Sequence, residues 1–223
     1  MSPYLLMMFF SILILGTMMT LSSSHWLLAW MGLELNTFAI IPIMAQKNNP
    51  RALEATLKYF IVQATAAIML LFASTLNAWF SGQWNIQMIT HPVPLAIITT
   101  ALALKMGLAP IHAWFPEVLQ GLDFKVGLIL TTWQKLAPLA LLAQISYEYS
   151  TLYVILGLTS ILVGGWGGIN QTQLRKILAY SSIAHLGWVI LVIHYFPTIA
   201  LLTFLIYTTL TLTLFFSFDF LYS

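Results

Sequence analysis

Five ionisable side chains lie in segments that are otherwise almost entirely apolar. They are Glu34, Lys58, Lys105, Lys135 and His185. All except Lys58, which stands near the start of its segment, lie close to the middle of a run long enough to cross a bilayer. A lysine or aspartate at the centre of a transmembrane helix costs about 2.5 to 3.5 kcal/mol on insertion scales. The four central residues therefore indicate a function, and groups that gain and lose protons at membrane depth can form a proton relay.

A structural role remains open for several of these residues. Lys58 can extend along its helix until the ammonium group reaches the membrane surface. His185 can stay neutral and bridge two helices through hydrogen bonds. Glu34 can form a purely structural pair with one lysine, although two central lysines and one central glutamate leave a surplus cation.

A buried lysine is well suited to carrying a proton. Burial disfavours its charged form and a neighbouring carboxylate favours it, so moving or screening the carboxylate turns the lysine into a proton donor. Two lysines joined by water and histidine can then pass a proton laterally. The sequence therefore predicts a relay that includes Glu34, Lys105 and Lys135.

The stretch ALALKMGLAPIHAW, residues 101–114, combines Lys105 with two residues that weaken helices. Pro110 cannot donate a backbone hydrogen bond to residue 106, and Gly107 tolerates unusual dihedral angles. We expect the helix to be interrupted between about Lys105 and Pro110, with Lys105 facing the interior of the subunit. Freed backbone at membrane depth needs polar company, which we expect from hydrated lysine and histidine. A simple proline kink is the alternative interpretation.

Two further residues extend the predicted path. His112 follows Lys105 by seven residues, which on a helix is nearly the same face and about 10 Å along the axis. We expect His112 to continue the path toward the even-numbered loops. Lys135 is expected at the membrane depth of Lys105, with water or the hydroxyl of Thr132 bridging the two lysines.

These residues belong to a chain that is suited to lipid. Of its 223 residues 60% are hydrophobic and 6% are charged, and its mean hydropathy is +0.91. Because a transmembrane helix needs about 20 apolar residues, the chain has room for about eight. The predicted fold class is an all-α polytopic membrane protein with a discontinuous fourth helix. The predicted spans are 4–22, 25–45, 57–79, 94–115, 126–147, 151–169, 176–194 and 197–217.

Basic residues occur only in alternate loops. The second predicted loop holds Lys47 and Arg51, the fourth holds Lys125, and the sixth holds Arg175 and Lys176. Short basic loops stay on the side that is not translocated. The N-terminus and the even loops are therefore predicted in the cytoplasm or, for a mitochondrial protein, in the matrix. The net charge of +2 follows from this asymmetry, and no contiguous basic stripe indicates a nucleic-acid partner.

Several other chemistries have no support in the sequence. It contains no cysteine, which excludes disulfides, thiolate metal sites and iron–sulfur clusters within it. It contains no Gly-rich phosphate loop, His-Glu-x-x-His motif or nucleophile elbow. We expect no cofactor and no metal. The segment GGWGG, residues 164–168, has the GxxxG spacing that favours close helix packing.

Five longer stretches resemble one known family. They are HWLLAWMGLELN, NPRALEATLKYF, LKMGLAPIHAWFPEVLQG, TWQKLAP and GGWGGINQTQLRKILAYSSIAHLGW. They are similar to the animal-type, mitochondrially encoded subunit 2 family of NADH dehydrogenase, a membrane-arm component of respiratory complex I. The resemblance covers essentially the whole chain. It implies an antiporter-like bundle of two inverted five-helix repeats, with 1–149 as the first repeat and 150–223 as an incomplete second one.

The resemblance also implies a function. The chain is expected to be a subunit of proton-translocating NADH:ubiquinone oxidoreductase, without a redox centre or substrate site of its own. Proton-path residues of the family map onto Glu34, Lys105 and Lys135, with Lys58 and His185 as further candidates. The implied location is the mitochondrial inner membrane, with several passes and the N-terminus in the matrix. Its expected partners are other membrane-arm subunits and phospholipids, and it is not expected to function as a monomer.

One departure from the family pattern leaves alternatives open. The family's second repeat has its own broken helix with another lysine, and this sequence stops before that point. We expect a fragment, a truncated chain or a divergent terminus. A structural or assembly role without a proton channel is therefore the second hypothesis. A stand-alone cation/proton antiporter is the third, and it rests on fold analogy alone.

Overall fold

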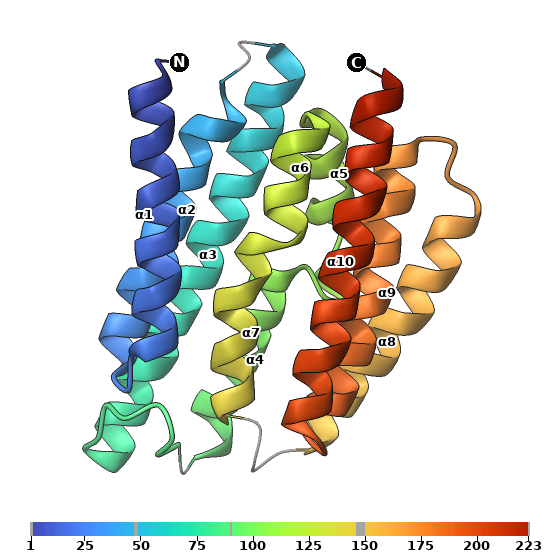
Figure 1. The fold of residues 1–223 in the computed structure, drawn as a ribbon. Coiled ribbons are helices and arrows are strands. Elements are labelled where there is room, and N and C mark those ends of the chain that lie inside the picture. The colour runs from blue at the N-terminus through green and yellow to red at the C-terminus, as the bar shows by residue number, and fades with distance from the viewer. Residues whose placement is uncertain (1, 47–48, 90, 146–149, 223) are drawn as a thin grey trace. The chain divides into compact units, whose positions relative to one another are not determined.

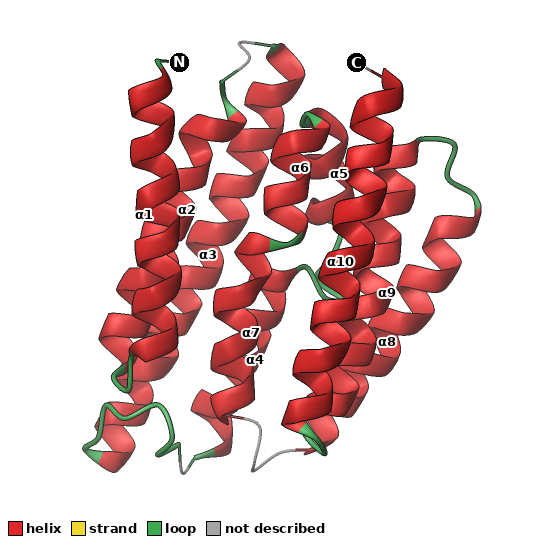
Figure 2. Cartoon of the chain, viewed as in Figure 1, coloured by secondary structure: helices red, strands yellow, loops and turns green. Residues whose placement is uncertain are grey.

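The chain is almost entirely helical (Figures 1 and 2). The computed structural model describes residues 2–46, 49–89, 91–145 and 150–222. In these ranges its helices are α1 (Pro3–Ser22), α2 (Trp26–Met44), α3 (Pro50–Ser81), α4 (Pro92–Met106), α5 (Trp114–Gly121), α6 (Phe124–Thr131), α7 (Trp133–Ile145), α8 (Ser150–Ile169), α9 (Leu174–Ile193) and α10 (Pro197–Tyr222).

The predicted membrane spans correspond to these helices. Among the described residues, seven helical segments are long and apolar enough to cross a membrane, with α6 and α7 together forming one of them. Helix α4 is apolar but shorter, as expected for half of a broken span. The largest boundary error is in α3, which begins at Pro50 and not at residue 57. The first turns of α3 are polar, so hydropathy did not reveal that the helix begins there. Proline at the first helical position favours this start.

Residues Met1–Lys105 and Leu136–Ile145 form one compact unit. In this unit α2 packs against both α1 and α3. Helices α1 and α2 approach closely at two glycines, since a Cβ atom on Gly16 would lie 2.9 Å from the carbonyl oxygen of Gly32. The close approach is possible only because both side chains are absent.

The first and third loops meet within the same unit. His25 forms an isolated antiparallel bridge with Asn85, and its ring stacks on Trp84 at 5.5 Å. The backbone N–H of Trp26 donates to the carbonyl of Trp84 at 3.0 Å. These contacts hold the first and third loops together within the unit.

Residues Met106–Lys135 and Ser146–Ser223 form the second compact unit. Helix α9 packs against α5, α8 and α10, and α10 also packs against α6. A Cβ atom on Gly164 would lie 2.6 Å from the backbone nitrogen of Ala184, so this glycine permits the close approach of α8 and α9. Close packing at the GGWGG segment is confirmed for Gly164, whereas Gly165 faces open space.

The fourth and sixth loops meet within the second unit. The side-chain amide of Gln120 donates to the side-chain oxygen of Gln173, and Arg175 donates to the carbonyl of Gln120 at 3.2 Å. In the first unit two odd-numbered loops are in contact, and in the second unit two even-numbered loops are in contact. A chain that crosses the membrane at every span requires this pairing. Which side faces the matrix stays a prediction, and Lys47 lies outside the described residues.

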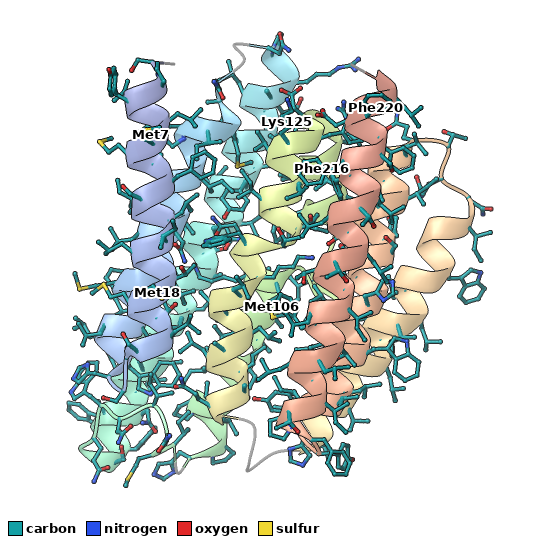
Figure 3. All side chains as sticks on the ribbon, viewed as in Figure 1. Met7, Met18, Met106, Lys125, Phe216 and Phe220 are labelled. Atoms are coloured by element: carbon teal, nitrogen blue, oxygen red, sulfur yellow. The ribbon has the colours of Figure 1, made fainter. Side chains whose placement is uncertain are left out.

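Large apolar side chains cover the outer surfaces of the helices (Figure 3). Met7 and Met18 project from α1, and Phe216 and Phe220 project from α10. In water such a surface would be unfavourable, but in a bilayer it faces hydrocarbon. The all-α membrane fold class is confirmed. The division into repeats at residues 149 and 150 stays a prediction, because packing units do not report internal symmetry.

Candidate functional site

The fourth span is interrupted at the predicted place. Helix α4 ends at Met106 and α5 begins only at Trp114. Gly107 has a φ of +77°, which side-chain-bearing residues rarely adopt, and a Cβ atom there would lie 3.2 Å from the Cβ atom of Phe115. Gly107 therefore ends α4 by its backbone conformation, and Pro110 prevents the helix from resuming at once. The interpretation as a simple proline kink is wrong.

Hydroxyl groups of α8 satisfy the backbone of the interruption. The N–H of Ala109 donates to the hydroxyl of Ser160 at 3.0 Å, and the hydroxyl of Thr159 donates to the carbonyl of Ala109 at 3.2 Å. Ser160 in turn donates to the carbonyl of Leu156 at 2.6 Å. We expected lysine and histidine to supply these hydrogen-bond partners. Hydroxyls are favoured because they satisfy a buried backbone group without bringing a charge into the interior.

Lys105 lies at the end of α4, inside the first unit. Its side chain is 7% exposed, and its Nζ atom has no hydrogen-bond partner among the described residues. Its orientation toward the interior is therefore confirmed. Its carbonyl, near the open end of α4, accepts a hydrogen bond from Gln63 at 3.4 Å. Gln63 is a polar neighbour that the sequence did not reveal.

Glu34 is half-buried on α2, in the same unit as Lys105. Its carboxylate accepts a hydrogen bond from Thr37 at 3.0 Å. It acts electrostatically on both Lys105 and the buried Tyr59, but it forms no hydrogen bond with the Nζ atom of Lys105. Glu34 and Lys105 are thus neighbours without being a direct pair. This excludes the tight structural ion pair as the account of these two residues.

Lys135 is the most deeply buried of the candidate side chains, with an exposure of 2%. Its Nζ atom lies 3.3 Å from the hydroxyl of Ser182 and 3.5 Å from the hydroxyl of Tyr207. It also lies 4.2 Å from the ring centroid of Phe115, where the π face stabilises a cation. Phe115 is the residue that packs against Gly107, so the interruption helps to position the surroundings of Lys135.

A second irregularity lies directly before Lys135. Helix α6 ends at Thr131 and α7 begins at Trp133, which the sequence did not predict. The N–H of Lys135 donates to the carbonyl of Thr132 at 3.3 Å, three residues back, and the carbonyl of Thr131 accepts from Tyr207 at 2.9 Å. The hydroxyl of Thr132 donates to the carbonyl of Leu128. Its predicted bridging role, and the matched depth of the two lysines, stay predictions.

The structure separates the remaining candidates. Lys58 forms an ion pair with Glu54 at 2.9 Å, and its side chain is 43% exposed, which fits the interpretation that it reaches toward the surface. His185 is exposed on α9, and its ring centroid lies 5.8 Å from that of Tyr207, next to the Lys135 cluster. The helical-spacing argument for His112 is wrong, because residues 107–113 are not helical. The Nδ1 atom of His112 lies 3.2 Å from the carbonyl of Pro110.

A family comparison places this geometry among known proteins. A family model described as "NADH:quinone oxidoreductase/Mrp antiporter, TM" matches residues 23–223. The chain belongs to this family. The interrupted helix and the buried lysines described above are therefore features of a member of this family.

Curated relatives within the family are similar over nearly the whole chain. NADH-ubiquinone oxidoreductase chain 2 of Tetraodon nigroviridis is 63% identical over 98% of this chain. The protein of the same name from Salmo salar is 61% identical over 95% of it. The chain spans 63% and 61% of the lengths of these two relatives.

Two solved structures show the same fold. A chain of respiratory complex I from Thermus thermophilus, solved with bound aureothin, has a TM-score of 0.81 and 28% identity over 86% of this chain and 46% of that one. A chain of the Mrp complex from Dietzia has a TM-score of 0.83 at 19% identity, over 92% of this chain and 42% of that one. The second likeness concerns the fold alone. An antiporter-like membrane bundle is thus confirmed.

Proposed function

We propose that the chain is a membrane-arm subunit of proton-pumping NADH:ubiquinone oxidoreductase and conducts protons along its buried polar residues. The names of its curated relatives support the assignment to this enzyme. The proposed location is the mitochondrial inner membrane, with the N-terminus in the matrix. Partners on this proposal are other membrane-arm subunits and phospholipids, which would cover the apolar outer surfaces.

The observation that carries the proton-path proposal is the environment of Lys135. The side chain is buried among Ser182, Tyr207 and Phe115, and no carboxylate of the described residues forms an ion pair with it. The charged and neutral forms of a buried amine that is surrounded by neutral groups differ little in free energy. A neighbouring charge can therefore decide which form is present. Such a group can take up a proton and release it again, whereas a tight ion pair would hold the proton.

Lys105 and Glu34 provide a second proposed site, within the first unit. Lys105 has a buried ammonium group without a described hydrogen-bond partner, and Glu34 acts on it electrostatically from α2. When Glu34 moves or is neutralised, the charged form of Lys105 loses support and its proton becomes easier to give up. The interrupted helix is compatible with this proposal, since irregular backbone at membrane depth is tolerated where it is buried in protein or lines a water-filled cavity.

The experiment replaces Lys135 by methionine in the assembled complex. Sealed membrane vesicles would be assayed for NADH oxidation, for protons translocated per electron, and for the amount of assembled complex on native gels. We expect normal assembly and fewer protons per electron. Lys125→Gln is the matched control, because Lys125 has a 79% exposed side chain at the start of α6. If K135M kept the full proton-to-electron ratio, this site would not conduct protons, and the assembly role would be favoured.

A further inference from the structure

Tyr207 connects three helices around Lys135. It belongs to α10, and its hydroxyl contacts Thr131 of α6 and Lys135 of α7, which are far from it along the chain. Its side chain is 1% exposed. The hydroxyl donates to the carbonyl of Thr131 at 2.9 Å and lies 3.5 Å from the Nζ atom of Lys135. It therefore touches both the amine and the backbone irregularity that precedes the amine.

The hydrogen atoms in this cluster can be assigned from the donor inventory. A tyrosine hydroxyl has one proton, and in Tyr207 that proton points to the carbonyl of Thr131. The proton of Ser182 points to the carbonyl of Ala179 at 2.7 Å. Both hydroxyls therefore turn lone pairs toward Lys135 and accept from it. This arrangement suits an ammonium group, which has three donors and no acceptor.

A neutral amine would need a different arrangement. It has one lone pair, which in a dry interior should receive a hydrogen bond because an unpaired buried polar group is costly. Tyr207 can supply the donor by rotating its O–H bond away from Thr131, without moving its ring. The carbonyl of Thr131 then loses its partner. The N–H of Lys135, four residues later, is the donor that a regular α-helix would offer to this carbonyl.

We propose that Tyr207 is a positioning residue that couples the protonation state of Lys135 to the irregularity between α6 and α7. With Lys135 charged, Tyr207 holds the carbonyl of Thr131 and the irregularity persists. When Lys135 passes its proton to a water molecule of the proposed path, the hydroxyl of Tyr207 donates to the neutral amine and the carbonyl of Thr131 accepts from the backbone N–H of Lys135. No proton leaves Tyr207 in this step, since its O–H bond only changes direction. The inference rests on the proposed proton-conducting role of Lys135.

Phenylalanine at position 207 tests the inference, because it removes one oxygen atom and keeps the ring. The same measurements as for K135M would be made on Y207F in the assembled complex, together with NADH oxidation in the presence of an uncoupler. We expect normal assembly, normal uncoupled oxidation and proton translocation slower by about tenfold, which corresponds to about 1.4 kcal/mol. A purely structural tyrosine would change assembly and leave the ratio of protons to electrons unaltered.

Tyr153→Phe is the matched control. Tyr153 is also 1% exposed and belongs to the same unit, but its hydroxyl has no hydrogen-bond partner among the described residues. The double variant with K135M supplies the second comparison. If Tyr207 acts through Lys135, adding Y207F to K135M should cause no further loss. A further loss of similar size in the double variant would overturn the inference.

The possible outcomes separate this inference from the function on which it rests. An unchanged ratio in K135M would remove the proposed function itself. If K135M translocates fewer protons per electron but Y207F behaves like Y153F, the proposed function stands and only the role of Tyr207 is excluded. If Y207F failed to assemble, a high-resolution structure of the unmodified complex would decide. A Tyr207 hydroxyl beyond hydrogen-bond distance of Lys135 would overturn the inference, and contact with both Lys135 and Thr131 would support it.

Discussion

At the residue scale, the two central lysines differ in how their charge is accommodated. Lys135 has two hydroxyl acceptors and an aromatic face within reach. Lys105 has no hydrogen-bond partner among the described residues and depends on the more distant charge of Glu34. The charged form of Lys135 is thus supported by local hydrogen bonds, whereas that of Lys105 is supported by a more distant charge.

Replacing Ser182 by alanine tests the hydrogen-bond support of Lys135. The variant removes one of the two hydroxyls that accept from Lys135, so the charged form loses support. We expect proton translocation to slow by about threefold to tenfold, for about 1 kcal/mol of lost hydrogen bonding. Assembly should be unchanged. Ser181→Ala is the control, because among the described residues the hydroxyl of Ser181 donates to the carbonyl of Leu178 within its own helix and to no other group. Equal effects in both variants would contradict the argument.

A change at Glu34 tests the distant charge. Glu34→Gln removes the negative charge that acts on Lys105 and preserves the shape of the side chain. We expect assembled complex with fewer protons translocated per electron, since Lys105 would stay neutral for more of the cycle. Glu54→Gln is the control, because Glu54 is exposed and pairs with Lys58 near the start of α3. A normal ratio in E34Q would exclude Glu34 from the path.

At the element scale, the interruption between α4 and α5 depends on one glycine and on two hydroxyls from another helix. The positive φ of Gly107 is one that residues with a side chain rarely adopt, and a Cβ atom there would crowd Phe115. Ser160 and Thr159 supply the hydrogen bonds that the unwound backbone lacks. The local sequence breaks the helix, and α8 makes the broken backbone tolerable at membrane depth.

Gly107→Ala should destabilise the interruption. Alanine at a positive φ costs about 1 to 2 kcal/mol, and its Cβ atom would press on Phe115. We expect less assembled complex and a lower melting temperature, measured by native gels after graded heating. Gly165→Ala is the control, since that site is helical and open and alanine favours helix there. A heat resistance of G107A equal to that of G165A would refute the structural role of Gly107.

At the scale of the whole molecule, loops of equal parity are in contact within each compact unit. His25 meets Asn85 in the first unit, and Gln120 meets Gln173 in the second. Both contacts join loops of equal parity, as a chain that crosses a bilayer at every span requires. The basic loop residues belong to the even loops, so these loops are predicted in the matrix.

Labelling tests the orientation directly. The chain has no cysteine, so a single cysteine at position 83 or 125 gives a unique thiol within it. Both residues are exposed, in the third loop and at the start of α6 respectively. In mitochondria stripped of their outer membrane, a membrane-impermeant maleimide should label Q83C and reach K125C only after the inner membrane is opened. The reverse pattern would invert the topology.

The sequence by itself determined the class of the protein and the location of its unusual residues. Hydropathy fixed the spans to within a few residues in most cases, because lipid forces every span to be helical. Gly107 and Pro110 predicted the interruption, because their effects on the backbone are local. The central ionisable residues were visible because apolar surroundings make a charge conspicuous.

Only the tertiary structure decided which groups surround those charges. Ser160, Ser182 and Tyr207 gave no signal, because a hydroxyl in a transmembrane helix can equally well bond to its own backbone. The carbonyl of Thr131, at the irregularity, accepts a hydrogen bond from Tyr207, which is distant in sequence. The helical spacing that placed His112 on the face of Lys105 failed because the helix between them is broken. Hydrogen-bond partners of this kind are set by how helices pack side by side, and the one-dimensional pattern does not contain that information.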